Sequence, residues 1–178
     1  MSNIVITTPR LKIRYWKDED SAPFIEMNQN ADVMRFFPKL QTPVETLQQI
    51  ERIKKHFEEY GYGLFAMERI DNGEFIGFTG FAHPTFKSHF TPCVEIGWRL
   101  KANSWGNGFA TEAAKACLQY GFTKLALPEI YSFTATINTP SINVMKKCGM
   151  TYLENFEHPA LADGDRLKTH VLYKANKW

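Results

Sequence analysis

Short runs of alternating apolar and polar residues dominate the first hundred positions and predict β-strands. Residues 4–15 mix β-branched side chains with regularly spaced basic ones, so we expect one strand there. Three more strand-like runs cover residues 63–69, 75–82 and 92–100. The turn Asp71-Asn72-Gly73 between the first two of these predicts an antiparallel hairpin.

The clearest helical pattern begins at Thr42. Thr42 can cap a helix, Pro43 suits its first turn, and Glu45 can complete a capping box. Apolar residues follow at helical spacing, and Gly61 supplies a left-handed exit. A shorter helix is expected after residues 18–20, whose three acidic side chains suit a helix start.

The second half alternates between the two periodicities. Residues 110–126 have a helical composition, and residues 130–137 are β-branched and aromatic, which indicates a buried strand. A short helix opens at Thr139-Pro140 and ends at Gly149, and a final strand pair is expected at 150–156 and 169–174. Antiparallel strands followed by a β-α-β-α-β half predict an α+β fold with a mixed sheet, not a doubly wound parallel one.

Composition narrows the range of function classes. The 178 residues suffice for one domain with a real core, and 44% apolar with 22% charged residues is typical of soluble globular proteins. A formal net charge of +2 without a basic stripe argues against nucleic-acid binding, and no apolar stretch is long enough to span a membrane. The N-terminus has no signal-peptide pattern, so we expect a single cytoplasmic domain, 1–178.

The three cysteines form no CxxC pair, so neither a zinc site nor a disulfide framework is indicated; they are Cys93, Cys117 and Cys148.

A glycine-containing loop, Trp105-Gly106-Asn107-Gly108-Phe109-Ala110, stands between a strand and a helix. Two glycines there permit a tight turn and leave backbone N–H groups uncovered for an oxyanion, which the helix dipole also favours. A plain tight turn explains them equally well. A Walker loop is disfavoured because no Lys follows Gly108, and the dinucleotide fingerprint is disfavoured because residue 111 is Thr rather than Gly.

Residues 105–113 resemble the acyl-CoA pyrophosphate loop of the GNAT superfamily of N-acetyltransferases. They most resemble its ribosomal-protein N-terminal (RimJ/RimL-like) branch, which shares the departure of Trp105 from the superfamily's usual Gln or Arg. Four further segments are similar to that branch in the right order: 8–14, 33–37, 95–98 and 138–150. The resemblance therefore covers essentially the whole chain.

The resemblance implies a GNAT-type mixed, mainly antiparallel sheet that is flanked by helices and splays open near residues 95–98. Acetyl-CoA would be the cosubstrate, with no metal, and its pantetheine arm would enter the gap. The cofactor-binding residues implied are Ile96, Gly97, Trp98, Trp105, Gly106, Asn107, Gly108, Phe109, Ala110, Thr111, Asn138 and Ser141.

Members of this superfamily use direct attack by the amine, so no covalent enzyme intermediate is implied. Glu95 is the expected base, because its apolar strand neighbours would raise its pKa. The alternatives are a solvated carboxylate or an ion pair with Arg99. Ser141 is the expected acid or hydrogen-bond donor to the departing thiolate, and the alternative is a capping hydroxyl.

Several weaker candidates remain. His170 and Tyr173 are secondary candidates on the acceptor side, whereas His83, His89 and His158 stand isolated in the sequence. An apolar acceptor pocket, or else ordinary core, is expected from Trp16, Phe36, Phe37 and Trp98. Acceptor specificity is expected to lie in the loops 38–42, 84–92 and 157–166.

We expect the acceptor to be a small-molecule amine or a protein N-terminus, with no nucleic-acid or membrane partner, and the enzyme to be a monomer or homodimer. Two rival hypotheses stay open at this point. One is a non-catalytic acyl-CoA-binding or sensor module, and the other is a nucleotide-binding protein.

Overall fold

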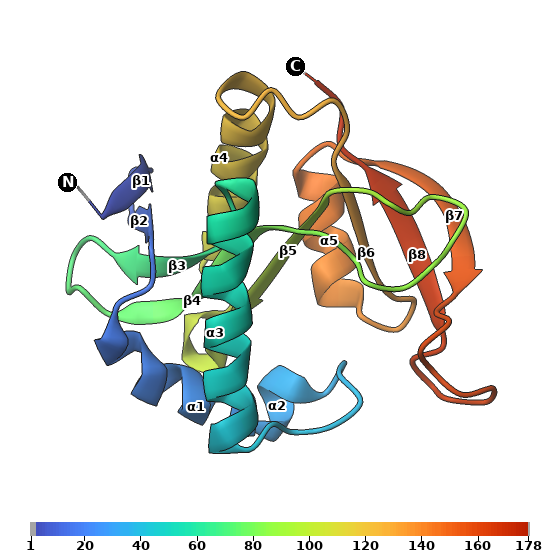
Figure 1. Ribbon diagram of the computed structural model, residues 1–178, viewed down its shortest axis with the longest axis horizontal. Coiled ribbons are helices and arrows are strands. Elements are labelled where there is room, and N and C mark those ends of the chain that lie inside the picture. The colour runs from blue at the N-terminus through green and yellow to red at the C-terminus, as the bar shows by residue number, and fades with distance from the viewer. Residues whose placement is uncertain (1–2, 178) are drawn as a thin grey trace.

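One mixed sheet organises the computed structural model, which describes residues 3–177 (Figure 1). In the described chain its eight strands follow the order β1-β2-β3-β4-β5-β6-β8-β7. All neighbours are antiparallel except β5 and β6, which are parallel. The strands are β1 (Ile4–Thr7), β2 (Leu11–Arg14), β3 (Leu64–Arg69), β4 (Phe75–Ala82), β5 (Glu95–Leu100), β6 (Tyr131–Ala135), β7 (Thr151–Glu157) and β8 (Thr169–Lys174). The predicted α+β class with a mainly antiparallel mixed sheet is confirmed.

The helices flank this sheet: α1 (Ser21–Gln29), α2 (Ala31–Met34), α3 (Pro43–Tyr60), α4 (Phe109–Thr123) and α5 (Thr139–Lys147). The predicted start of α3 is confirmed. Thr42 Oγ1 accepts from the Glu45 N–H at 3.2 Å, and the Glu45 carboxylate accepts from the Thr42 N–H at 2.8 Å. Gly61 ends the helix with φ of 75°. None of the helices in residues 3–177 is long and apolar enough to cross a membrane.

The N-terminal region differs from the prediction of one strand over residues 4–15. The chain turns back at residues 8–10, and β1 and β2 form an antiparallel hairpin. Pro9 has no N–H to offer a ladder, and the Thr8 N–H closes the turn on the Leu11 carbonyl at 2.9 Å. The short helix α2 was not predicted, because its only local signal is the cap that Asn30 provides to the N–H groups of Asp32 and Val33.

Elsewhere the predicted elements are found with small shifts at their ends. β4 and β8 have the predicted bounds, whereas β5 begins at Glu95 rather than at residue 92. The predicted hairpin of β3 and β4 is confirmed. β6 is only partly buried, contrary to the expectation of a buried strand, because part of it lines an open cleft.

Two hydrophobic clusters hold the helices against the sheet. One joins α1, α2 and α3 to β4 through residues such as Phe24, Ile50 and Phe78. The other joins α4 and α5 to the sheet and includes Ile96 of β5. α4 lies so close that a Cβ atom on Gly121 would meet the Phe81 ring at 2.7 Å. This close packing holds the C-terminal part of α4 against β4.

Candidate functional site

A cleft opens where β5 and β6 separate. The two strands pair at Glu95 and Tyr131, the only register pair between them in the described chain, and then diverge. Figure 1 shows β1 to β4 on one side of this opening and β6 to β8 on the other. The cleft has a volume of about 780 Å³ and is lined by both strands, the loop before α4 and the start of α5. The predicted splay of the sheet is confirmed.

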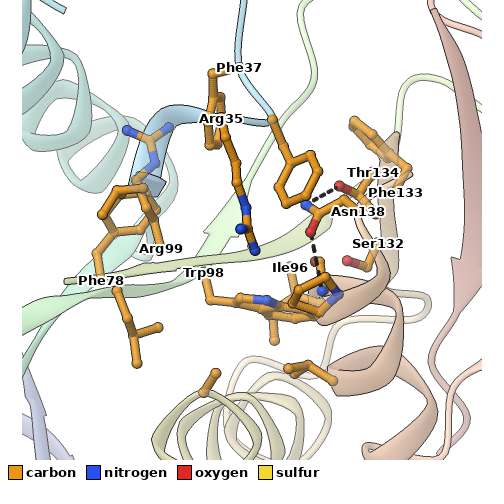
Figure 2. Close-up of a pocket in the computed structure, with 18 of the residues that line it drawn as sticks. Arg35, Phe37, Phe78, Ile96, Trp98, Arg99, Ser132, Phe133, Thr134 and Asn138 are labelled. Carbon is orange, nitrogen blue, oxygen red and sulfur yellow. Dashed lines mark hydrogen bonds between the residues drawn. The ribbon is translucent and has the colours of Figure 1, made fainter. Parts of the chain in front are cut away.

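Because side chains alternate along a strand, the residues of β5 face two opposite sides of the sheet. Arg99 points toward α1, because its Nη1 donates to Asn28 Oδ1 at 2.7 Å. Glu95 lies four residues earlier and therefore on the same face of the strand. Ile96 and Trp98 face the opposite side, where Ile96 belongs to the cluster that includes α4. Figure 2 shows Arg99 and Phe78 toward one end of the cleft and Asn138 toward the other.

The glycine loop presents an uncapped helix N-terminus to the cleft. Gly106 and Gly108 have φ of 75° and 79°, a left-handed conformation that other residues adopt at a cost. No side chain of the described residues caps α4 at Gly108, so the first-turn N–H groups stay available to an anion. The loop is held by Arg10, whose Nη1 donates to the Asn107 carbonyl at 2.9 Å and whose Nε donates to Glu112 at 2.7 Å.

All the predicted cofactor-binding residues line the cleft except Asn107. The Asn107 side chain turns back onto its own loop and donates to the carbonyls of Ser104 and Trp105. Its amide therefore stabilises the turn, because it is committed to the carbonyls of two residues at the start of the loop.

Asn138 lines the cleft and caps the start of α5. Its Oδ1 accepts from the Ser141 N–H at 3.3 Å, and its Nδ2 donates to Thr134 Oγ1 at 2.8 Å (Figure 2). The alternative view of Ser141 as the capping hydroxyl is therefore wrong, since Asn138 occupies that position. Ser141 lines the cleft, and no described residue forms a hydrogen bond with its hydroxyl.

Glu95 sits at the point where the strands separate. Its carboxyl group is largely enclosed by protein, and this burial raises its pKa to about 8. The alternative of an ion pair with Arg99 does not occur, because the described partner of Arg99 is Asn28. A carboxyl group with this pKa, lining the cleft, can accept a proton near neutral pH.

The histidines are arranged differently from the isolated positions that the sequence suggests. His158 and His170 both line the cleft with ring centroids 4.8 Å apart. Burial lowers the pKa of His170 to about 4, so it is neutral at physiological pH. His83 hydrogen-bonds to His56 at 3.1 Å, away from the cleft lining. Tyr173 is 5% exposed in the core and does not line the cleft.

Three of the four predicted pocket aromatics line the cleft: Phe36, Phe37 and Trp98. Trp16 is a core residue whose indole donates to the Leu64 carbonyl at 2.7 Å and whose ring packs on Phe24. Sequence reasoning missed the role of Arg99 as a cleft residue. The available signal was its position four residues after Glu95, which places both side chains on one face of a strand.

The three loops that were expected to govern specificity contribute unequally. Pro38 lines the cleft, as do Ala160 and Leu161. The loop over residues 84–92 does not line the cleft. Its Phe86 and Phe90 pack against Phe133 of β6, which does line it. Within residues 3–177 no group of three or more His, Cys, Asp or Glu side chains is arranged to hold a metal ion.

Comparison of the chain with known sequences identifies its protein family. Residues 10–151 match the Acetyltransferase (GNAT) domain. YkkB and the uncharacterized N-acetyltransferase YnaD, both of Bacillus subtilis (strain 168), are each 31% identical to the chain. These matches cover 83% of this chain and 85% of YkkB, and 82% of this chain and 81% of YnaD. Spermidine N(1)-acetyltransferase of Escherichia coli (strain K12) is 26% identical over 86% of this chain and 80% of its own.

Solved structures agree on the fold. A GNAT-family acetyltransferase from Bacillus anthracis superposes with a TM-score of 0.79 at 29% identity, covering 95% of this chain and 96% of its own. RimL, a ribosomal-protein alpha-N-acetyltransferase solved with coenzyme A, gives a TM-score of 0.77 at 15% identity, covering 96% of each chain. At that identity the second likeness concerns the fold alone.

Proposed function

The chain belongs to the GNAT acetyltransferase family, and on that premise we propose that it moves the acetyl group of acetyl-CoA to a primary amine by direct attack, with Glu95 as base and Ser141 as hydrogen-bond donor. The enzyme is an acetyl-CoA-dependent N-acetyltransferase. The observation that carries the residue roles is the raised pKa of a cleft-lining carboxyl group at the point where the sheet opens.

The cleft fits acetyl-CoA in two respects. The uncapped start of α4, with Gly106 and Gly108 in left-handed conformations, suits a pyrophosphate. The edge of β5 beyond Glu95 lacks a strand partner on the β6 side, which suits the amides of a pantetheine arm. Acetyl-CoA supplies the activated thioester, and the residues proposed to hold it are Ile96, Gly97, Trp98, Trp105, Gly106, Gly108, Phe109, Ala110, Thr111, Asn138 and Ser141.

Glu95 and Ser141 act at the two ends of the reaction, Glu95 on the amine and Ser141 on the leaving sulfur. A primary amine must lose a proton to become nucleophilic, and Glu95 with its pKa of about 8 accepts that proton directly or through water. Ser141 donates a hydrogen bond to the sulfur as the bond from the carbonyl carbon to sulfur breaks. The proton that the nitrogen loses as the amide forms goes to the departing thiolate, which leaves as the free thiol of coenzyme A. The N–H groups at the start of α5 favour the negative charge on that sulfur.

We propose the ribosomal-protein N-terminal (RimJ/RimL-like) branch for this chain, acting as a single domain over residues 1–178. The support is the ordered set of similar segments from residue 8 to residue 150 and the shared fold with RimL. A protein N-terminus and a small-molecule amine are both acceptors of this chemistry, and the relatives named above include enzymes of both kinds.

The decisive experiment measures thiol release from acetyl-CoA with a panel of amines and peptide N-termini. We expect Glu95→Gln to lower kcat/KM about 10²- to 10⁴-fold, the usual range for general base catalysis, and to remove the rise of the wild-type rate with pH near 8. Glu51→Gln, on the exposed face of α3, is the matched control and should leave both unchanged. An unchanged pH profile in Glu95→Gln would remove Glu95 from the role of base. Cofactor binding with no thiol release on any amine would indicate a sensor module.

A further inference from the structure

Arg99 carries a buried charge that no acidic group of residues 3–177 neutralises. Its side chain lines the cleft although the residue is only 8% exposed. Nη1 donates to Asn28, Nε is buried without a hydrogen-bond partner, and no described residue accepts a hydrogen bond from Nη2. The described residues therefore leave Nε and Nη2 without an acceptor, and a carboxylate oxygen is the acceptor that a guanidinium binds most strongly.

The surroundings hold this guanidinium in place without neutralising it. The rings of Phe37 and Phe78 lie 3.9 and 5.3 Å from its central carbon. Asn28 is 0% exposed, and its Nδ2 is bound to the side-chain oxygens of Gln41, Thr46 and Gln49. Because Arg99 has only donors, the Asn28 oxygen must face it. An amide occupies the position from which a carboxylate would have cancelled the charge.

The charged residues that line the cleft favour some classes of acceptor amine over others. Arg35 also lines it, and the acidic residues of the lining are Asp32, which is exposed, and Glu95. A polyamine would bring further positive charge next to two arginines, which is unfavourable in a partly desolvated cleft. An amine that carries a carboxylate would find a partner for each end.

We propose that the acceptor is an amine bearing a carboxylate and that Arg99 binds that carboxylate while Glu95 faces the amine. This inference rests on the proposed acetyl transfer and specifies its substrate class. Residues 95 and 99 share one strand face, so their Cα atoms lie about 13 Å apart at about 3.3 Å per residue. The amine and carboxylate of the acceptor are accordingly separated by several bonds, as in a long ω-amino acid or in a peptide whose acidic side chain follows its N-terminus.

The test compares acceptors that differ only in the carboxylate. The small-molecule arm uses ω-amino acids of increasing length against their amides, with spermidine as a cationic acceptor. The peptide arm uses N-terminal peptides with Asp or Asn at the second and third positions. We expect kcat/KM to favour the acid over its amide about ten- to hundredfold in one arm, with spermidine the poorest substrate. The arm that shows the preference identifies the source of the carboxylate.

Two variants assign this preference to Arg99. Arg99→Gln should abolish it while acetyl-CoA binding persists, and Arg52→Gln on exposed α3 should leave it intact. Asn28→Asp keeps Arg99 and supplies an internal carboxylate, so it should also abolish the preference even where Arg99→Gln does not fold. Equal rates on acids and amides in the wild-type enzyme would overturn the inference and leave acetyl transfer standing. A preference that survives in Asn28→Asp or in folded Arg99→Gln would also overturn it. Absence of thiol release with every amine would instead overturn the proposed function.

Discussion

Two buried arginines lie on different strands of one sheet, with opposite surroundings. Arg14 of β2 is 2% exposed and binds two carboxylates, Asp20 at 2.7 and 2.8 Å and Glu68 at 2.7 Å. Burial acts to lower the pKa of Arg14, but the hydrogen bonds to these partners outweigh it and raise the pKa. Arg99 of β5 has only a neutral amide as hydrogen-bond partner, and burial lowers its pKa to about 10.

The contrast separates a structural charge from a charge that is open to a ligand. Arg14 and its two carboxylate partners join β2, β3 and the 3-10 helix at Asp18–Asp20 into a neutralised network outside the cleft lining. A buried charge with no opposite charge beside it costs free energy. Such a charge in the lining of a cleft therefore points to an acidic ligand that neutralises it. Both arginines are about equally buried, so burial does not distinguish them. They differ in their partners, because the neutral amide beside Arg99 leaves its charge without a neutralising acid.

The largest expected effect comes from breaking the neutralised network. Arg14→Ala leaves two buried carboxylates without their shared cation, so we expect the free energy of unfolding to fall by about 3–5 kcal/mol. Equilibrium urea unfolding measures this difference, and Arg52→Ala on exposed α3 is the control. A loss below about 1 kcal/mol would mean that the network contributes no more than a surface ion pair.

The next effect is a pH dependence of opposite sign in the two regions. Burial acts to raise the pKa of Glu68, but hydrogen bonds from Arg14 and Lys17 outweigh it and lower the pKa from 4.5 to about 2. The stability that Glu68 contributes is therefore fully present above pH 4.5 and is lost as the pH falls toward 2, about 3 kcal/mol at 1.36 kcal/mol per pKa unit. The pKa of Glu95 is raised to about 8, so its protonated form favours the fold, and that contribution is lost as the pH rises from 4.5 through 8.

Unfolding curves across pH for two variants separate these contributions. Glu68→Gln should differ from the wild type mainly in its response between pH 4.5 and 2, and Glu95→Gln mainly in its response between pH 4.5 and 8. Parallel curves for the wild type and Glu95→Gln above pH 4.5 would show that Glu95 has an ordinary pKa.

The smallest expected effect is on the stability of the Arg99 region. Arg99→Gln removes one hydrogen bond and two ring contacts but strands no carboxylate, so we expect a loss of about 1 kcal/mol in the free energy of unfolding. The same urea unfolding measurement applies. A loss as large as that of Arg14→Ala would make Arg99 a structural residue and would erase the distinction between the two arginines.

Much of the fold could be predicted because its signals are local. The capping box at Thr42, the turn at Asp71-Asn72-Gly73 and the bounds of β4 each depend on neighbouring residues. The failures arose at two short elements, the turn over residues 8–10 and the helix α2, where the local signals were few. The glycine loop was found from its two glycines before a helix, but the assignment of its ligand needed the resemblance of the whole chain.

The sequence by itself determined the strands and helices, the left-handed glycines and the placement of Glu95 and Arg99 on one face of a strand, because φ/ψ preferences and side-chain periodicity act over a few residues. The tertiary structure decided which charges are neutralised. The partner of Arg99 is 71 positions away and that of Arg14 in β3 is 54 positions away. It also decided that His158 and His170 meet in the cleft. Such partners come from packing between distant segments, since a residue's own periodicity fixes the face it presents but not what lies against that face.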